Sequence, residues 1–499
     1  MGRQRSIVLV TVDCLRADHV GFMGYKRPTT PFLDSLSGES LIVPNAIVAG
    51  APTYYSFPAI LASRFPLALG RDALGVGPEE PTLAAVLQEA GYATGAFVAA
   101  NPYISASFGY ERGFDTFRDF LEADPVPLAD AQSSPQGAGW ASRINRGLQR
   151  IRPLLGPLGS AYDELYFQYC QRAIPVPDSL DCLRRFPAAN ELVDEAIKWI
   201  EKAGDDPVFL WLHLMDPHSP YCPKQEAIAM MGDDSLTPFR VRYLNSYWNR
   251  SDLGPRGLAR QRDAIVCLYD AGIRWVDAQM ERLAQGLRKS DRWQDCIFAV
   301  TADHGEEFLE HGGRYHAPSR LTEELIHVPL LLRVPGAQKE KVSEAPFSMI
   351  HLAPTLLDAA AVPAPAEFHG KSQWRQLQSG EDFNGGAISE CVAACTNPFR
   401  RENRIGARVL SVRSARFKLV LHFDPVAEEF YDLEADPEEK FALAPSVAKA
   451  ERGHLLEIAR DHLQRSVRER DRNTRLQVQL RDLQLEWRKP ARKASPAAH

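Results

Sequence analysis

The sequence has no marked excess of charge of either sign. Its 58 Lys and Arg residues are balanced by 64 Asp and Glu residues, and the formal net charge is -6. A nucleic-acid-binding surface needs a clustered excess of Lys and Arg to neutralise phosphate groups. We therefore expect no nucleic-acid partner.

Long apolar runs and paired cysteines are also missing. No segment reaches the roughly 18 uninterrupted apolar residues that a membrane-spanning helix requires. The apolar run that begins at Ile7 ends at Asp13, which is too early for a signal peptide or a span. The 8 cysteines form no CxxC pair, which fits reduced thiols better than a disulfide framework. We expect no membrane span and a cytoplasmic location.

What the sequence does contain is the composition of a large globular protein. With 499 residues, 45% of them apolar, the chain can bury a substantial core. Strand-like and helix-like segments alternate, which predicts an α/β fold with a largely parallel sheet covered by helices. The predicted strands are residues 7–12, 93–98, 208–214, 297–301 and 328–334. The predicted helices are residues 82–90, 191–202, 265–287 and 350–360.

The chain changes character twice along its length. Residues 1–385 form the predicted α/β domain. Residues 386–446 predict a small antiparallel subdomain, because strand-like segments at 408–412 and 417–422 precede a turn-rich stretch. The composition of residues 447–499 predicts a charged helical tail with a disordered end.

The α/β domain is interrupted by a variable insertion at about residues 120–188, rich in Pro, Gly, Ser and Ala. Within it, apolar residues recur at helical spacing over residues 140–158, which predicts a basic amphipathic helix. This helix fits a lid or a packing element, and a helix lying on a membrane surface is the alternative.

Polar residues gather directly after three of the predicted strands. Open α/β sheets place their ligand sites at the carboxyl ends of the strands, so we expect these residues to share one site. They are Asp13 and Arg16, Asp216 and His218, and Asp303 and His304.

Two of these clusters suit a metal ion. Asp13 directly follows a buried strand, where an ionised carboxylate needs a cation or an arginine as its partner. Asp303 and His304, followed by Gly305, offer an anionic oxygen and an imidazole nitrogen in a tight turn, which suits a divalent ion. The alternatives are that Asp13 caps a helix or pairs with Arg16, and that Asp303 caps a turn.

The third cluster has two histidines beside a proline-stiffened turn. His213 and His218 flank this turn, and a histidine held there could keep a proton donor rigidly over a substrate. The alternative is a hydrogen-bonded core histidine, which suits His213 on the apolar strand better than His218.

From residue 7 to about residue 443 the sequence resembles the sulfatase branch of the alkaline-phosphatase superfamily. The stretches that carry the resemblance, in order, are TVDCLRADHVGFMGY with TTPFLDSL, LQEAGYATGAFV, WLHLMDPHSPY, YDAGIRWVD, TADHGEEFLEHG, EELIHVPLLLRVPG, HLAPTLLDAA, and RSARFKLVLHF with FYDLEADPEE. The resemblance implies an alkaline-phosphatase-like mixed, mostly parallel sheet flanked by helices, with a small C-terminal antiparallel α+β subdomain. It also implies a metal-dependent hydrolase of ester bonds.

The resemblance assigns a metal site. Asp13, Asp303 and His304 would ligate one divalent cation, and the sequence leaves open whether this is Mn, Zn, Ca or Mg. Cys14 stands where the family has the second of two paired aspartates. The predicted ligand set is therefore these three residues and the hydroxyl of Thr53.

The resemblance also assigns residues that would meet the substrate. His218 would contact the transferred group or the leaving oxygen, and His316 would take the place of a substrate-binding lysine or histidine. Asn101 stands where the family often has a histidine. Arg16 and His213 complete the predicted substrate-binding residues.

The nucleophile position departs from the family pattern. Sulfatases carry a Cys or Ser there, in a C/S-x-P-x-R motif, and oxidise it to formylglycine. Thr53 occupies this position and is not a substrate for that oxidation, while a competing alignment on Ser56 needs a gap and still lacks the arginine. We expect Thr53, activated by the metal, to act as the nucleophile through a covalent intermediate. The alternative is that Thr53 caps the helix that follows it.

These residues predict a metal-dependent hydrolase of sulfate or phosphate-type esters, acting on an anionic small-molecule, glycan or lipid-type substrate. The alternatives are a formylglycine-independent sulfatase, a phospho-group transferase and a catalytically degenerate binding protein. The sequence leaves open whether the chain forms a homo-oligomer.

Overall fold

The structure is a computed structural model that describes residues 4–71, 73–121, 157–176, 178–232, 235–337, 343–383 and 385–487. Most of the insertion predicted at residues 120–188, with residues 140–156 of its predicted helix, lies outside these ranges, as does the predicted disordered end of the tail. In the part of the chain that is described, no helix is long and apolar enough to cross a bilayer.

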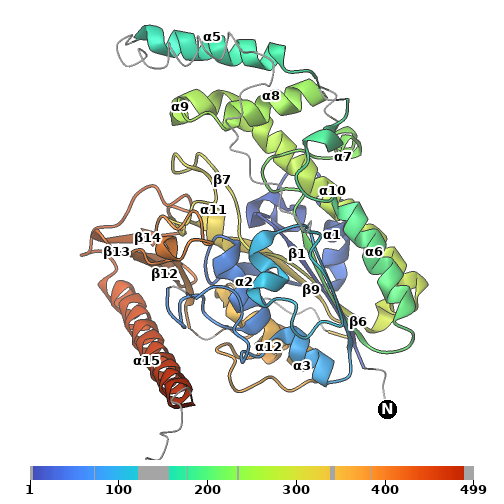
Figure 1. The fold of residues 1–499 in the computed structure, drawn as a ribbon, viewed down its shortest axis with the longest axis vertical. Coiled ribbons are helices and arrows are strands. Elements are labelled where there is room, and N and C mark those ends of the chain that lie inside the picture. The colour runs from blue at the N-terminus through green and yellow to red at the C-terminus, as the bar shows by residue number, and fades with distance from the viewer. Residues whose placement is uncertain are drawn as a thin grey trace, which may run out of the picture.

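A mixed sheet forms the centre of the fold (Figure 1). Its strands are β1 (Ser6–Val12), β2 (Leu41–Ile47), β3 (Ala93–Val98), β4 (Thr116–Arg118), β5 (Val208–Leu214), β6 (Cys296–Ala302), β9 (His327–Arg333) and β10 (Phe347–Ser348). Their order in space is β10-β2-β9-β6-β1-β5-β3-β4. β1 runs parallel to its neighbours β5 and β6, whereas β9 is antiparallel to β2 and β6. The predicted α/β fold with a mixed, mostly parallel sheet is confirmed.

The central strands are apolar because the sheet is covered on both faces. All 7 residues of β1 are buried, and so are all 7 residues of β5. The five predicted strands are all present, as β1, β3, β5, β6 and β9. The sequence pattern does not predict β2, because Pro44 argues against a strand there. The structure accommodates this proline at an irregularity between Val43 and Ala46 in the pairing with β9.

Helices cover both faces of this sheet (Figure 1). One face carries α1 (Pro31–Leu36), α6 (Ala189–Lys202) and α10 (Arg262–Lys289). The other face carries α2 (Thr53–Ala62), α3 (Leu83–Glu89) and α12 (Leu352–Ala359). Four of these, α3, α6, α10 and α12, are the predicted helices. The apolar residues of α6 recur on one side of the helix, and that side is buried.

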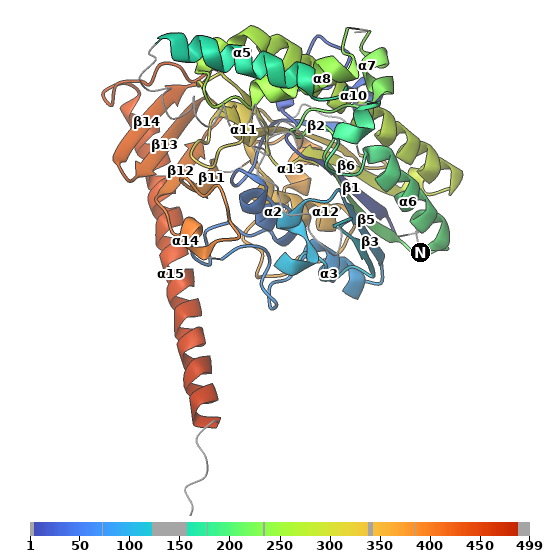
Figure 2. The same ribbon diagram turned by 45° about the horizontal axis from the view of Figure 1, so that its top comes forward.

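Shorter elements connect and cover this core. They are α5 (Pro157–Ala173), α7 (Gln225–Met230), α8 (Pro238–Trp248), α9 (Pro255–Leu258), β7 (Glu307–Phe308), β8 (Arg314–Tyr315), α11 (Glu323–Ile326), α13 (Trp374–Ser379) and α14 (Arg401–Arg404). α5 lies beside α8 (Figures 1 and 2), where the rings of Phe167 and Tyr243 are 5.5 Å apart. The described end of the predicted insertion therefore packs on the body of the protein.

The C-terminal part is a second, antiparallel sheet. Its strands are β11 (Ala387–Val392), β12 (Arg408–Arg413), β13 (Phe417–Phe423) and β14 (Val426–Asp432), paired in that order. The last helix, α15 (Lys449–Trp487), lies against β12 and β13 and then extends away from the body (Figure 2). His462 of α15 lies 2.9 Å from Oε2 of the buried Glu390 in β11, which anchors the helix to the sheet.

A glycine lets the longest helix of the core approach the turn after β5. A Cβ atom on Gly272 of α10 would lie 2.7 Å from the carbonyl oxygen of Asp216, which is closer than Cβ atoms approach backbone. The added Cβ atom would be fixed to the backbone of α10, and the oxygen belongs to the backbone of the turn. The contact can therefore only be relieved by moving backbone.

We expect Gly272→Ala to lower the free energy of unfolding by about 1–3 kcal/mol, because the added methyl group forces α10 from the turn. The matched control is Gly453→Ala in α15, where a Cβ atom would meet nothing within 4 Å. That substitution removes only glycine's backbone freedom and should stabilise by up to about 1 kcal/mol. Thermal and urea unfolding would measure both. A Gly272→Ala protein as stable as the control would contradict the close contact.

Candidate active site

The residues predicted for the site meet at one edge of the large sheet. β1, β5 and β6 lie side by side and run in the same direction, so the residues that follow them converge. Asp13 follows β1, and Asp303 and His304 follow β6. Thr53, the first residue of α2, reaches the same place from the other side.

Asp13 is fully buried and held by three donors. Its Oδ2 accepts hydrogen bonds from Nδ2 of Asn101 at 3.0 Å and from Nε2 of His213 at 3.2 Å. Its Oδ1 accepts from the Cys14 thiol at 3.0 Å. Burial alone would raise the pKa of Asp13, but the three histidines around it outweigh that effect and hold the pKa well below its usual value. Asp13 is therefore a fixed, ionised carboxylate.

Asp303 has one satisfied and one unsatisfied oxygen. Its Oδ1 accepts from the backbone N–H groups of His304 at 2.9 Å and Cys14 at 3.3 Å. Its Oδ2 is buried and has no hydrogen-bond partner among the described residues. Burial and the neighbouring Asp13 raise the pKa of Asp303. Two adjacent buried carboxylates, one with a free oxygen, are an arrangement that a bound cation stabilises.

The ring of His304 presents a lone pair to both carboxylates. Its Nδ1 lies 2.8 Å from the carbonyl oxygen of Gly305, which can only accept, so we assign the proton to Nδ1. In the neutral ring Nε2 then carries the lone pair, and it lies 3.7 Å from Asp13 and 3.5 Å from Asp303. A histidine whose second nitrogen is held by a carbonyl is the usual form of a metal ligand. Nε2 of His304 therefore lies within 4 Å of an oxygen of each of the two other predicted ligands.

Thr53 points its hydroxyl at this ligand set. Its Oγ1 lies 3.1 Å from Nε2 of His304. The N-cap residue of α2 is Pro52, and the Thr53 side chain makes no capping hydrogen bond. The prediction that Thr53 caps the helix is wrong for that reason. Ser56, the competing nucleophile, is fully buried and donates its hydroxyl to the carbonyl oxygen of Thr53 at 3.1 Å, so it turns away from the ligands.

Two further histidines lie outside the ligands, toward the surface. The ring of His316 is 4.6 Å from the ring of His304, and the ring of His218 is 5.1 Å from that of His316. Both side chains are partly exposed. They therefore lie between the His304 ring and the surface, within reach of solvent.

The sequence motifs do not predict what two residues of the site do, Cys14 and Glu306. Burial and the acidic neighbours, Glu306 first, raise the pKa of Cys14 well above its usual value, so the thiol stays protonated and donates to Asp13. Glu306 is fully buried, lies 3.3 Å from Nδ1 of His316 through Oε2, and leaves Oε1 without a partner among the described residues. Its place two residues after His304 is the only sequence signal.

Among the described residues, three sets of ligand atoms at the site lie within 4.8 Å of one another: Cys14 with His304 and His316, Asp13 with Cys14 and His218, and Asp13 with His213 and Asp303. Each set holds one or two of the predicted ligands, and none holds all three. The donors of the site are therefore more numerous than the predicted ligands.

The structure corrects the prediction that His213 binds substrate. The side chain is fully buried, and both ring nitrogens have partners. Because the carboxylate of Asp13 can only accept, Nε2 of His213 donates to it, and Nδ1 lies 3.0 Å from the hydroxyl of Thr11. His213 orients Asp13 and cannot reach a substrate.

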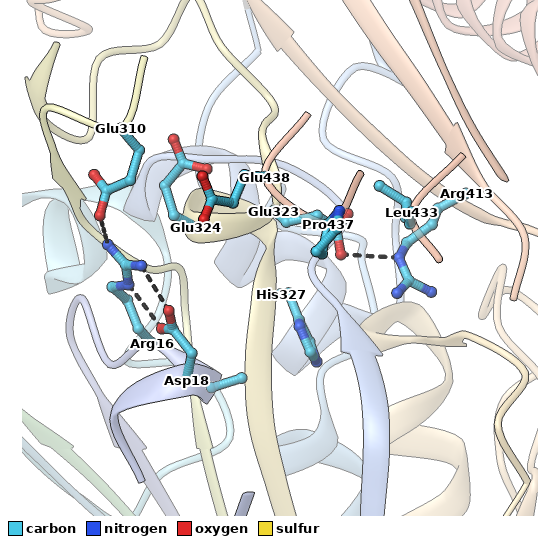
Figure 3. A pocket seen from close by; sticks show the side chains of 11 residues that line it. Arg16, Asp18, Glu310, Glu323, Glu324, His327, Arg413, Leu433, Pro437 and Glu438 are labelled. Atoms are coloured by element: carbon cyan, nitrogen blue, oxygen red, sulfur yellow. Dashed lines mark hydrogen bonds and ion pairs between the residues drawn. The ribbon is translucent and has the colours of Figure 1, made fainter. Parts of the chain in front are cut away.

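Arg16 also has a different role from the predicted one. Its Nη2 lies 2.7 Å from Asp18 and its Nη1 2.7 Å from Glu310, while Nη1 also donates to the carbonyl oxygen of Glu306. Figure 3 shows it beside a cavity of about 370 Å³. Five carboxylates line this cavity against two arginines: Asp18, Glu310, Glu323, Glu324 and Glu438. Such a lining repels an anionic ester, so the prediction that Arg16 binds substrate is corrected: Arg16 ties the loop after β1 to the loop after β6.

Asp216, from the third predicted cluster, is structural as well. One of its oxygens pairs with Arg184 at 2.7 Å and the other accepts from the backbone N–H of Ala189, at the start of α6. It is therefore not a ligand for a metal ion.

Comparisons with known proteins show the family to which the chain belongs. A family model described as Sulfatase matches residues 5–362, and a model described as N-sulphoglucosamine sulphohydrolase, C-terminal, matches residues 312–457. An arylsulfatase from Clostridium perfringens is 23% identical over 90% of this chain and 92% of its own length. Arylsulfatase K from Gallus gallus is 27% identical over 50% of this chain and 51% of its own, so the chain spans about half the length of several curated relatives it matches.

Solved structures share the fold. A phosphonate monoester hydrolase from Agrobacterium radiobacter superposes with a TM-score of 0.64 and 19% identity, covering 93% of this chain and 96% of that one. A protein solved in complex with its substrate D-glucosamine-2-N,6-O-disulfate has a TM-score of 0.66 at 18% identity, covering 93% of this chain and 98% of that one. The Sulfatase model covers well over half of the sequence, and the chain therefore belongs to the sulfatase family.

Proposed function

We propose that the protein is a metal-dependent hydrolase of sulfate or phosphate-type esters that uses Thr53 as its nucleophile. The observation that carries the proposal is the Thr53 hydroxyl, 3.1 Å from Nε2 of His304 and beside two buried carboxylates. Relatives that include an arylsulfatase and a fold shared with a phosphonate monoester hydrolase support an ester of sulfur or phosphorus as substrate.

Asp13, Asp303 and His304 would hold one divalent cation, which is Mn, Zn, Ca or Mg. A cation bound there would lower the pKa of a nearby hydroxyl and neutralise charge on the ester group. The unpartnered Oδ2 of Asp303 and the deprotonated Nε2 of His304 are the groups of this chain that fit it best.

Side chains of the protein carry out the nucleophilic attack and the proton transfer. Oγ1 of Thr53, once its proton has passed to solvent, attacks sulfur or phosphorus, and the bond to the leaving oxygen breaks in line with it. Thr53 is the first residue of α2, so the positive end of the helix dipole favours negative charge on its oxygen. His316 or His218 gives a proton to the leaving oxygen, and water then hydrolyses the threonine ester.

His316 is supported by a carboxylate in this role. Burial raises the pKa of Glu306, but His316 outweighs it and the pKa is lowered, so Glu306 is ionised. An ionised Glu306 accepts from Nδ1 of His316 and leaves Nε2 for the leaving oxygen.

Thr53→Ala should lower kcat/KM on the best substrate by roughly 10³-fold or more, because it removes the nucleophilic oxygen. Aryl sulfate, phosphate, phosphodiester and phosphonate esters would be compared, which also separates sulfate from phosphate specificity. Thr53→Ser keeps a hydroxyl and should retain much more activity, and Ser56→Ala should be close to wild type. Full activity of Thr53→Ala would show that Thr53 is not the nucleophile.

Purified protein supplied with divalent ions should contain about one bound ion per chain, as measured by elemental analysis. Asp303→Asn should lose that ion, because the substitution removes the charge of a ligand. Asp263→Asn is the control, since the Asp263 side chain is 99% exposed on α10. A wild-type protein that binds no ion would favour the alternative of a degenerate binding protein.

A formylglycine-independent sulfatase and a phospho-group transferase use the same residues. The first would prefer sulfate over every phosphorus ester in the panel above. The second would release more product when an acceptor alcohol replaces water.

A further inference from the structure

A second group of possible metal ligands lies outside the candidate active site. It consists of Glu307 in β7, His311 in the loop between β7 and β8, and Glu324 in α11. One ligand atom from each of these residues lies within 4.8 Å of the other two. The group shares no residue with the predicted ligand set of the active site, so it needs an explanation of its own.

Glu307 has one oxygen with several partners and one with none. Its Oε1 accepts from the backbone N–H groups of His311 at 3.1 Å and Gly313 at 2.7 Å, and from Nη1 of Arg320 at 2.8 Å. Its Oε2 is buried and has no hydrogen-bond partner among the described residues, and the whole side chain is only 1% exposed. Burial raises the pKa of Glu307, and a cation at Oε2 would offset that cost.

The loop that carries His311 is fixed against this carboxylate. The backbone N–H of Leu309 donates to the carbonyl oxygen of Gly313 at 2.9 Å, and that of Gly312 donates to the carbonyl oxygen of Leu309 at 3.0 Å. A Cβ atom on Gly313 would lie 2.4 Å from Oε2 of Glu307, so a glycine is needed there to leave room for the oxygen. Glu307 and His311 are therefore held side by side by backbone contacts.

His311 and Glu324 form an ion pair that does not account for the whole group. Nδ1 of His311 lies 2.8 Å from Oε1 of Glu324, and this hydrogen bond is the main cause that raises the pKa of His311 to about 9. Nε2 of His311 is buried and has no hydrogen-bond partner among the described residues. The ion pair thus leaves two buried polar atoms unsatisfied, Nε2 of His311 and Oε2 of Glu307, and such atoms are rare without a ligand.

A cavity gives a cation access to this group. Glu324 also lines the cavity of about 370 Å³ in Figure 3, where Glu310 and Glu438 lie near it. The five carboxylates of this cavity outnumber its two arginines, so its potential attracts cations. A cation in the cavity reaches His311 and Glu307 through Glu324.

We propose that Glu307, His311 and Glu324 bind a second divalent cation, and that Zn²⁺ suits these donors best. One imidazole and two carboxylates are common zinc donors, and they leave a fourth tetrahedral position for water. The ion would join β7, the loop after it and α11, and the proposal does not depend on the proposed function. Because zinc must displace a proton from His311, it binds here only while free zinc is present.

The first test measures zinc by equilibrium dialysis on the whole chain without an affinity tag. Wild type should bind about two ions in excess zinc, and removal of free zinc should leave only the ion of the active site. Asp303→Asn should still bind about one ion in excess zinc. Adding Glu307→Gln or His311→Gln to Asp303→Asn should abolish that binding. The matched control adds His454→Gln, because His454 is an exposed histidine of α15.

The outcomes separate the two sites. If wild type binds a single ion that Glu307→Gln abolishes and Asp303→Asn does not, the metal site of the proposed function fails and the second site stands. No zinc in Asp303→Asn, or unchanged binding after Glu307→Gln is added, would overturn the second site.

The second test needs no loss of binding in a variant. Wild-type crystals soaked in zinc should show an anomalous scattering peak about 2.0–2.2 Å from an oxygen of Glu307, an oxygen of Glu324 and a nitrogen of His311. Zinc at 100 times its dissociation constant should also raise the thermal unfolding midpoint of Asp303→Asn by roughly 2–4 °C. A soaked crystal without a peak among these three residues would overturn the site.

Discussion

The candidate site depends on two carboxylates buried next to each other. Asp13 and Asp303 have no exposed surface, and Oδ2 of Asp303 has no hydrogen-bond partner among the described residues. Burying one such charge is expensive, and burying two together is possible only where positive charge and hydrogen-bond donors surround them. The rigid parallel strands β1 and β6 hold the two residues together regardless of that cost, because each strand is fixed along its length by its neighbours.

A chain of hydrogen bonds then fixes the carboxylate of Asp13. Trp211 donates to the hydroxyl of Thr11 at 3.0 Å, Thr11 contacts His213, and His213 donates to Asp13. Trp211, Thr11 and His213 lie in β1 or β5, and Asp13 directly follows β1, so these contacts are as rigid as the sheet itself. Tyr269 of α10 adds a bond at the start of the following loop, donating its hydroxyl to the carbonyl oxygen of Cys14 at 2.6 Å. The carboxylate position is therefore set by the core and not by a mobile loop.

The C-terminal sheet is more than an appendage to this site. Cys391 and Val409 belong to the same apolar core as the large sheet, although β11 begins near the predicted boundary at residue 386. Lys418 of β13 is fully buried and pairs with Glu323 at 3.1 Å and Glu439 at 2.7 Å, which ties the small sheet to the segment before β9. This attachment fixes the small sheet to the body of the protein.

Five strands of the large sheet and the residues at its carboxyl edge follow from the sequence pattern alone. β-branched, apolar runs define β1, β5 and β6, and a polar residue placed directly after such a run is bound to lie at the end of the strand. The tertiary structure alone decided what each side chain does there. His213 lies 200 residues from Asp13, and Glu310 lies 294 residues from Arg16. The local sequence pattern therefore could not predict either pair. Whether a polar side chain faces substrate or a buried partner depends on such long-range neighbours, and only the folded chain brings them together.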